Sequence, residues 1–371
     1  MYISLESFTA FLACLTVCHG LKASNIPSDT PLSSLISSAK SHLVNGSPRD
    51  ALLFYDAAVS RDPANYLTIF QRGATYLSLG KNSQASQDFD RVLGLKPDFE
   101  SALLQRARLR ARSADWSGAI ADLEKAGKKS SAEYQGLLEA QNAAQLAQDA
   151  EKQGSWTACV NQANVAVVKA NTALSLRRTR AHCRLEKGEV EEGISDLVHV
   201  LQISPGSVEP HLQISSMLFF SLGDSDRGIS QIRKCLHSDP ESKPCNQLYR
   251  KEKKLVKRLE KLQGALGSRK YSNAANMLVG AGGDSGLLGD IKKDVDQAKE
   301  AGHIHPAASN NLYVSLVDNT CEAYREVCVS LKGCDCLHIT NFTIDAYEQT
   351  CRPLLLRSPW IKPTLPSGPS V

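Results

Sequence analysis

Small and apolar residues recur along this chain at a fixed interval, separated by polar positions. Ala51, Ala85 and Ala119 are spaced 34 residues apart. The same interval separates the members of two further sets, Tyr55, Phe89 and Leu123, and Ala58, Val92 and Ala126. Within each interval the apolar residues fall at helical spacing, so the pattern predicts consecutive pairs of helices.

The clearest unit covers residues 66–99. We expect Gly73 to let its first helix approach the second, Ala85 to remove bulk at the closest crossing, and Pro97 to stop the second helix. A 34-residue helix-turn-helix unit of this kind is typical of the tetratricopeptide repeat. Such units stack to bury their apolar faces, which predicts an all-α superhelical solenoid with a concave surface.

Following the interval divides the chain into segments. The first segments are a linker at 24–31, repeats one to three at 32–138 and repeats four to six at 139–244. Residues 245–327 hold a seventh repeat, a glycine-rich connection near 280–306 and a partial eighth repeat. An atypical tail at 328–371 is expected to be disordered. The charged run Arg250–Gln263 is interpreted as part of a repeat-seven helix with a solvated face, because leucines recur in it at helical spacing.

Residues 1–23 contain the apolar run Phe8–Cys18, which is too short to span a bilayer. Together with small residues near Ala23, this predicts a secretory signal peptide. A buried N-terminal helix is the alternative, because the first seven residues carry Glu6 and no lysine or arginine. No later stretch is long and apolar enough for a membrane span, so a lumenal or secreted soluble protein is expected.

Composition reduces the number of function classes that fit this chain. The chain has 371 residues, 42% of them hydrophobic and 6% aromatic, and a net charge of +4, which favours a helical core and gives no electrostatic case for nucleic acid. Nine of the 11 cysteines lie beyond the predicted signal peptide, so at least one is unpaired or bridged to another chain. Cys334 and Cys336 have the wrong spacing for a zinc site, and neither a metal, a cofactor nor an enzyme activity is expected. Thiol-disulfide exchange by this pair stays an alternative.

Two long blocks make the pattern more specific: FQRGATYLSLGKNSQASQDFDRVLGLKPDFESALLQRARLR and LQISPGSVEPHLQISSMLFFSLGDSDRGISQIRKCLHSDP. With the signal peptide and the repeats, they resemble the endoplasmic-reticulum (ER) lumenal DnaJ homologues of subfamily C member 3, the fungal members in particular. The resemblance implies repeats that hold unfolded clients, a C-terminal J domain that stimulates the ATPase of the chaperone BiP and, in some animal members, inhibition of translation-initiation-factor kinases. The J-domain motif His-Pro-Asp does not occur, since His305-Pro306 is followed by Ala307, so we expect this chain to lack that domain.

A client-binding groove is predicted on the first helices of repeats one to three. Its apolar members are Ile36, Leu43, Phe70, Leu77 and Leu104, with Lys40, Ala74, Arg108 and Ala111 beside them. These side chains could receive apolar segments of an unfolded chain, or they could simply pack helix on helix. The clamp that grips the C-terminal carboxylate of cytosolic heat-shock chaperones is not expected, because Ile36, Gln71 and Ser101 stand among its positions.

Cysteine pairs and sequons complete the candidate sites. A bridge between Cys235 and Cys245 across the Asp239-Pro240 turn is geometrically reasonable, and the family resemblance also implies a disulfide there. Cys159 and Cys183 could be bridged or merely buried, and buried thiols are favoured. Asn45 and Asn341 head possible glycosylation sequons.

These observations favour an ER-lumenal holdase that binds unfolded or misfolded proteins, with BiP as an indirect partner. The alternative is an adaptor or inhibitor that binds one folded partner, such as a translation-initiation-factor kinase.

Overall fold

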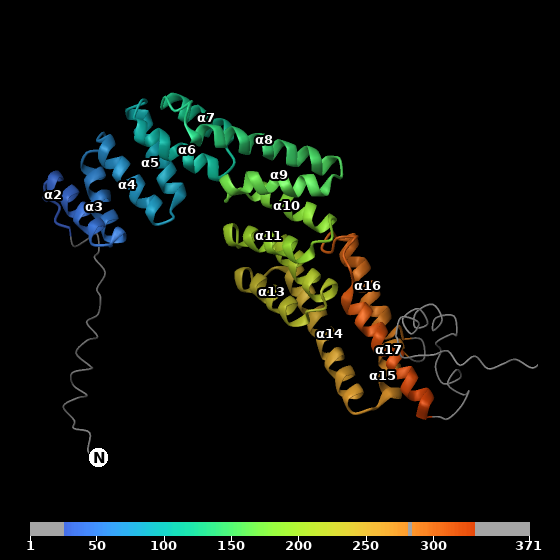
Figure 1. Cartoon of the computed structure of the whole chain (residues 1–371). Coiled ribbons are helices and arrows are strands. Elements are labelled where there is room, and N and C mark those ends of the chain that lie inside the picture. Colours follow the sequence, from blue (N-terminus) through green and yellow to red (C-terminus); the bar gives the residue numbers. More distant parts are fainter. Residues whose placement is uncertain (1–25, 281–283, 331–371) are drawn as a thin grey trace, which may run out of the picture. The chain divides into compact units, whose positions relative to one another are not determined.

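The computed structural model describes residues 26–280 and 284–330, and this part of the chain is α-helical apart from its turns and one π-helical segment (Figure 1). Helices pack as antiparallel pairs joined by short turns, which confirms the predicted all-α repeat fold. The predicted signal peptide, most of the predicted tail and Asn341 lie outside the described residues.

The described chain divides into two compact units. Unit 1 contains residues 26–142 and 168–173, and unit 2 contains residues 143–167, 174–280 and 284–330. The helix pairs of unit 1 are α2 (Leu32–Val44) with α3 (Pro48–Arg61), α4 (Tyr66–Ser78) with α5 (Asn82–Leu95), and α6 (Glu100–Arg112) with α7 (Trp116–Lys125). The next helix, α8 (Ala132–Lys152), begins in unit 1 and ends in unit 2.

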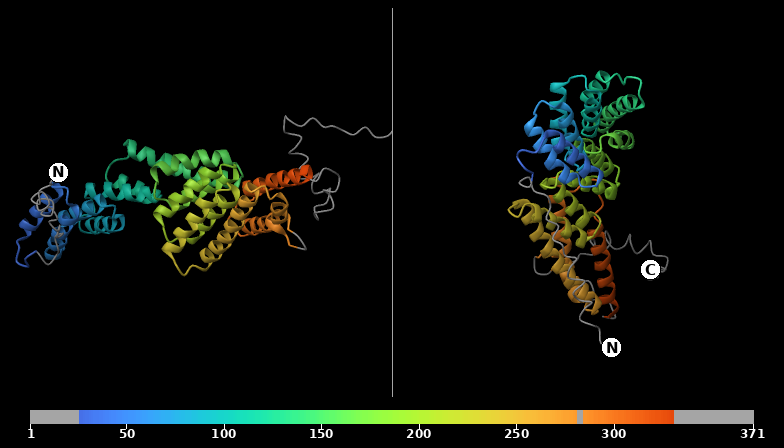
Figure 2. Two further views of the ribbon diagram at one scale, coloured as in Figure 1. Left: turned by 90° about the horizontal axis from the view of Figure 1, so that it is seen from below. Right: turned by 90° about the vertical axis from the view of Figure 1, so that its left-hand side faces the viewer.

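In unit 2, consecutive helices from α10 onward pack against one another (Figure 2). The helix α9 (Trp156–Lys169) belongs to this unit except for its last two residues. The other elements are α10 (Leu174–Glu186), α11 (Val190–Ile203), α12 (Val208–Ser216), the π-helical segment η2 (Met217–Ser221), α13 (Ser225–Ser238), α14 (Lys243–Gly267), α15 (Tyr271–Val279), α16 (Gly286–Glu300) and α17 (Asn311–Ser330). The largest apolar core of this unit includes Phe219 and Phe220 of η2.

The closest helix crossing in repeat two occurs where the sequence predicts it. A Cβ atom placed on Gly73 would lie 3.0 Å from Cβ of Asp88 and 3.0 Å from the Phe89 ring. Phe89 is fully buried in a core with Ile69 and Val92. Glycine at 73 therefore allows α4 to reach the aromatic core that α5 provides.

The prediction of a glycine-rich connection near 280–306 is wrong for the middle of this range, which forms the helix α16. Leu287, Ile291 and Val295 are buried at helical spacing on one face of this helix. Their burial against the core of unit 2 offsets the poor helix propensity of the flanking glycines. The predicted eighth-repeat helix corresponds to α17, which packs against α15 and α16.

The charged run in α14 has a solvated face, but one of its charged residues is an exception. Leu255 and Leu262 are buried as expected, whereas Glu252 is also fully buried. Helical spacing alone could not reveal this, because the partner of Glu252 is Ser215 on α12.

The turns that end α4 and α6 adopt the same left-handed conformation with different residues. Gly80 has φ +72°, and Ala114, in the equivalent place of the next repeat, has φ +65°. In both turns the following residue donates its N–H back to the helix, from Lys81 to Tyr76 and from Asp115 to Arg110. Ala114 therefore adopts a backbone conformation that strains any residue with a Cβ.

We expect Ala114→Gly to raise the free energy of unfolding of unit 1 by about 0.5–1 kcal/mol. Glycine relieves the strain of the left-handed backbone, and this gain is larger than the entropy cost of the more flexible unfolded chain. Denaturant unfolding measures this. The matched control is Gly80→Ala, which should lower the same free energy by a similar amount, since a Cβ at Gly80 meets nothing within 4 Å. Changes of the same sign in both variants would contradict the explanation.

Candidate functional site

A half-open cavity of about 350 Å³ lies between the first two repeats in unit 1. Lys40 and Leu43 come from α2, Tyr55 comes from α3, and Phe70 and Ala74 come from α4. Gln71, Thr75 and Ser78 complete its lining. Leucine, tyrosine and phenylalanine thus form an apolar floor, and a lysine and a glutamine stand beside it. This combination suits an apolar side chain of a peptide whose backbone needs polar partners.

Two of the five predicted apolar groove residues, Leu43 and Phe70, meet in this cavity. The structure places Ile36, Leu77 and Leu104 outside its lining. Leu77 packs against the core of repeat two and Leu104 against that of repeat three. Both leucines are partly buried.

Tyr55 is the aromatic lining residue that sequence reasoning missed as part of the groove. It occupies the same place in its repeat as the buried Phe89, so its sequence position indicated only a core residue. Its side chain is buried, and this burial raises the pKa of the phenol. Phe70 is held by two other rings, with centroids 5.7 Å away at Phe89 and 5.2 Å away at Phe99. The floor of the cavity is therefore a fixed surface.

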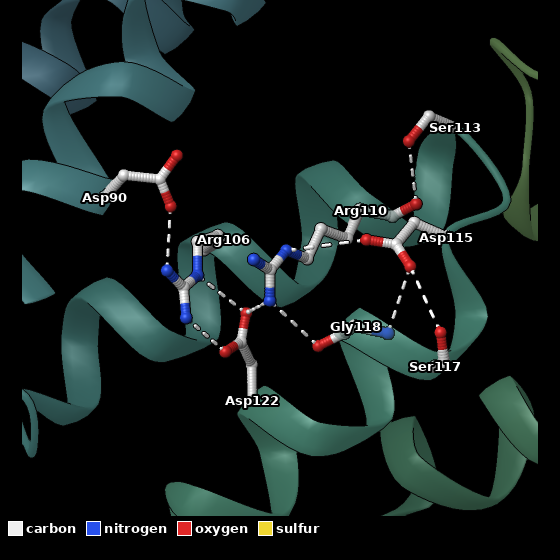
Figure 3. A network of polar contacts seen from close by, with 8 residues as sticks. All are labelled: Asp90, Arg106, Arg110, Ser113, Asp115, Ser117, Gly118 and Asp122. Atoms are coloured by element: carbon white, nitrogen blue, oxygen red, sulfur yellow. Dashed lines mark hydrogen bonds and ion pairs between the residues drawn. The ribbon is translucent and has the colours of Figure 1, made fainter.

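An arginine-aspartate network joins neighbouring repeats in unit 1 (Figure 3). Arg106 of α6 makes two hydrogen bonds to Asp122 of α7, of 2.6 and 2.9 Å, and one of 2.7 Å to Asp90 of α5. Arg110 donates a further hydrogen bond of 2.8 Å to Asp122. Hydrogen bonding to Asp122 raises the pKa of Arg106. One arginine thus connects the second helix of its own repeat with that of the preceding repeat.

The same arrangement recurs in other repeats. Arg72 bonds Asp88 and Asp56, and Arg180 bonds Asp196 and Asn164. In every case the arginine lies 16 residues from each partner. The 34-residue spacing of Arg72 and Arg106 in the sequence indicates this repeated network. A comparison of apolar and small residues alone does not detect it. The Arg72–Asp56 pair holds α4 to α3, two of the helices that line the cavity.

The two cysteine pairs considered within the repeats are both bridged. Cys235 and Cys245 form a disulfide between α13 and α14. Cys159 and Cys183 form another between α9 and α10, so the prediction of buried thiols at these positions is wrong. The two cysteines of that pair are fully buried as expected. Burial alone does not distinguish a thiol from a disulfide, and only the helix packing shows that the Cα atoms lie 6.2 Å apart. Asn45 is exposed at the C-terminal end of α2.

Glu252 is a buried carboxyl group in unit 2. Oγ of Ser215 lies 2.9 Å from Oε1 of Glu252 and also donates a hydrogen bond of 2.7 Å to the carbonyl oxygen of Gly228. Because a serine hydroxyl has one proton, its bond to Gly228 leaves only a lone pair for Glu252. A protonated Glu252 satisfies this geometry by donating to Ser215. Burial raises the pKa of Glu252 to about 8.

Within the described residues no helix is long and apolar enough to cross a membrane.

Comparison with known proteins identifies relatives of this chain. The tetratricopeptide repeat family model matches residues 68–99. The tetratricopeptide repeat and J domain-containing co-chaperone DNJ1 of Fusarium oxysporum f. sp. lycopersici is 47% identical over 319 residues, which cover 86% of this chain and 61% of the relative. DnaJ homolog subfamily C member 3 of Homo sapiens is 30% identical over 249 residues, which cover 64% of this chain and 49% of the relative.

The fold has a counterpart among solved structures. The crystal structure of the P58(IPK) TPR domain matches with a TM-score of 0.63 over 88% of each chain, at 24% sequence identity. Since this chain spans less than two thirds of the length of either curated relative, the similarity concerns their shared part. The repeat spacing, the helix pairs and the extent of the identity lead to one conclusion. The chain belongs to the family of tetratricopeptide repeat and J domain-containing co-chaperones that includes DnaJ homolog subfamily C member 3.

Proposed function

We propose that this protein is a holdase of the ER lumen, which binds unfolded or misfolded polypeptides weakly and passes them to BiP. The observation that carries the proposal is the half-open apolar cavity between repeats one and two, in a chain whose relatives are described as co-chaperones. Apolar side chains are the feature that unfolded chains expose and folded proteins bury, so an apolar cavity selects for non-native clients.

Two further observations support the lumenal location. The disulfides Cys159–Cys183 and Cys235–Cys245 are typical of proteins that fold in an oxidising compartment. The apolar run at Phe8–Cys18 has the length of a signal-peptide core. Delivery to BiP rests on the family alone.

The first test replaces Leu43 with glutamate. Leu43 lines the cavity and is 36% exposed, so the variant places a charge in the floor without removing a buried core residue. We expect affinity for a fluorescently labelled unfolded polypeptide to fall tenfold or more, because one leucine contact of about 1.5–3 kcal/mol is lost and a carboxylate is desolvated. Suppression of aggregation of a heat-denatured client should weaken in parallel.

The neighbouring residue offers a matched control. Val44 is 87% exposed and does not line the cavity, so Val44→Glu introduces the same charge one position away and should leave client affinity unchanged. Equal losses in both variants, at unchanged helical circular dichroism, would argue against this cavity as the binding site. An adaptor for one folded partner, such as a translation-initiation-factor kinase, would show a single stoichiometric complex and no suppression of aggregation.

A further inference from the structure

Three side chains with metal-binding atoms converge in unit 2, where the proposed client cavity makes no use of them. His182 and Glu186 lie four residues apart on α10, and His305 belongs to the segment between α16 and α17. Nε2 of His305 is 2.6 Å from Oε1 of Glu186, and Nε2 of His182 is 3.6 Å from the same oxygen. The ligand atoms of all three residues lie within 4.8 Å of one another.

His182 is already oriented to present a lone pair. Its Nδ1 lies 2.9 Å from Oε1 of Glu151, and Oγ1 of Thr179 donates to the other oxygen of that carboxylate at 3.2 Å. A carboxylate at Nδ1 favours the tautomer with its proton on that nitrogen, which directs the lone pair of Nε2 toward the cluster. The ring also packs against Trp156 in a T-shaped arrangement, with centroids 5.8 Å apart. This is the supporting arrangement found around metal-bound histidines.

The cluster opens onto a cavity of about 320 Å³, which His182, His303 and His305 help to line. The side chain of His305 is 9% exposed, and that of Glu186 is 26% exposed. A site with three protein ligands therefore has room for a water molecule in a fourth position.

We propose that His182, Glu186 and His305 bind a zinc ion. Two imidazoles and one carboxylate form a ligand set that zinc prefers, and tetrahedral ligands at about 2.0–2.1 Å from the ion stand roughly 3.3 Å apart. The His182–Glu186 distance is near this value. The ion replaces the Nε2 proton between His305 and Glu186, and that pair must separate by several tenths of an ångström.

Zinc binding also changes the tautomer of His305. Nδ1 of this ring now accepts a contact of 3.2 Å from the N–H of Ala307, so Nε2 carries the ring proton. On binding, that proton moves to Nδ1 and the long contact to Ala307 is lost. The ion then joins α10 to the segment that precedes α17, two parts of unit 2 that are far apart in the sequence.

The test is a titration of the full chain with Zn²⁺ in competition with a chromophoric chelator, followed by Co²⁺ as a spectroscopic probe. We expect one equivalent of Zn²⁺ to bind with a micromolar Kd, and Co²⁺ to give a four-coordinate spectrum without a sulfur-to-cobalt band. His182→Ala and His305→Gln should each weaken binding at least tenfold, and the glutamine at 305 can still donate to Glu186. Glu151→Gln should weaken it by about 10- to 100-fold.

His199→Ala is the matched control, because this histidine of α11 is exposed and its Nδ1 lies 2.8 Å from the carbonyl oxygen of Ser195 in its own helix. Its zinc affinity should equal that of the wild type. Wild-type affinity in both His182→Ala and His305→Gln would overturn the proposal and assign the ion elsewhere, for example to Cys334 and Cys336, which lie outside the described residues. Absence of saturable binding to the wild type would overturn it as well. Circular dichroism verifies that each variant keeps its helices.

Discussion

Replacing Asp122 with alanine should lower the free energy of unfolding of unit 1 by about 3–5 kcal/mol. The carboxylate is 4% exposed and accepts hydrogen bonds from both Arg106 and Arg110 (Figure 3). Without it, Arg106 keeps only its bond to Asp90 and no longer contacts α7. Arg110 keeps only its longer contacts to the carbonyl oxygen of Gly118 and to Asp115. Denaturant unfolding followed by circular dichroism measures the loss.

Asp90→Ala provides the control within the same network. Asp90 also pairs with Arg106, at 2.7 Å, but its side chain is 54% exposed and water can replace it. We expect its removal to change the free energy of unfolding by less than about 1 kcal/mol. Similar losses for both variants would show that burial of the carboxylate does not set the strength of the network.

The second large effect concerns Glu252 and pH. Its pKa is raised by burial from 4.5 to about 8, so the native state holds a proton that the unfolded chain releases above pH 4.5. The stability of unit 2 should therefore decrease as pH rises from 4.5 toward 8, by about 1.4 kcal/mol per unit and about 3 kcal/mol in total by pH 7. Below pH 4.5 both states are protonated at this group, and the effect vanishes.

Glu252→Gln isolates this contribution. The amide can donate to Ser215 as the protonated acid does, but it cannot ionise. The variant should match the wild type near pH 4 and exceed it by about 3 kcal/mol at pH 7, as measured by denaturant unfolding across that range. Glu260→Gln on the exposed face of the same helix controls for loss of one negative charge. A difference between Glu252→Gln and the wild type that does not change with pH would contradict a protonated Glu252.

The candidate cavity was half predictable from the sequence. Leu43 and Phe70 could be placed on the first helices of their repeats because the repeat register defines which face of each helix they occupy. Leu77 and Leu104 share that register, yet they pack against the cores of repeats two and three and lie outside the cavity. Tyr55 reaches the cavity from the second helix of repeat one, and no periodicity within one helix indicates that.

Local patterns determined the fold of this protein. The 34-residue spacing, the close crossing at Gly73 and the stops after each helix pair are properties of short segments, and each acts through contacts within one repeat or with the next. Tertiary structure decided which side chains from distant segments meet. The cluster of His182, Glu186 and His305, the disulfide Cys159–Cys183 and the pairing of Glu252 with Ser215 all join residues from different helices or loops. Their chemistry depends on distances of a few ångströms that only the packing of helices fixes, and so the sequence alone could not show it.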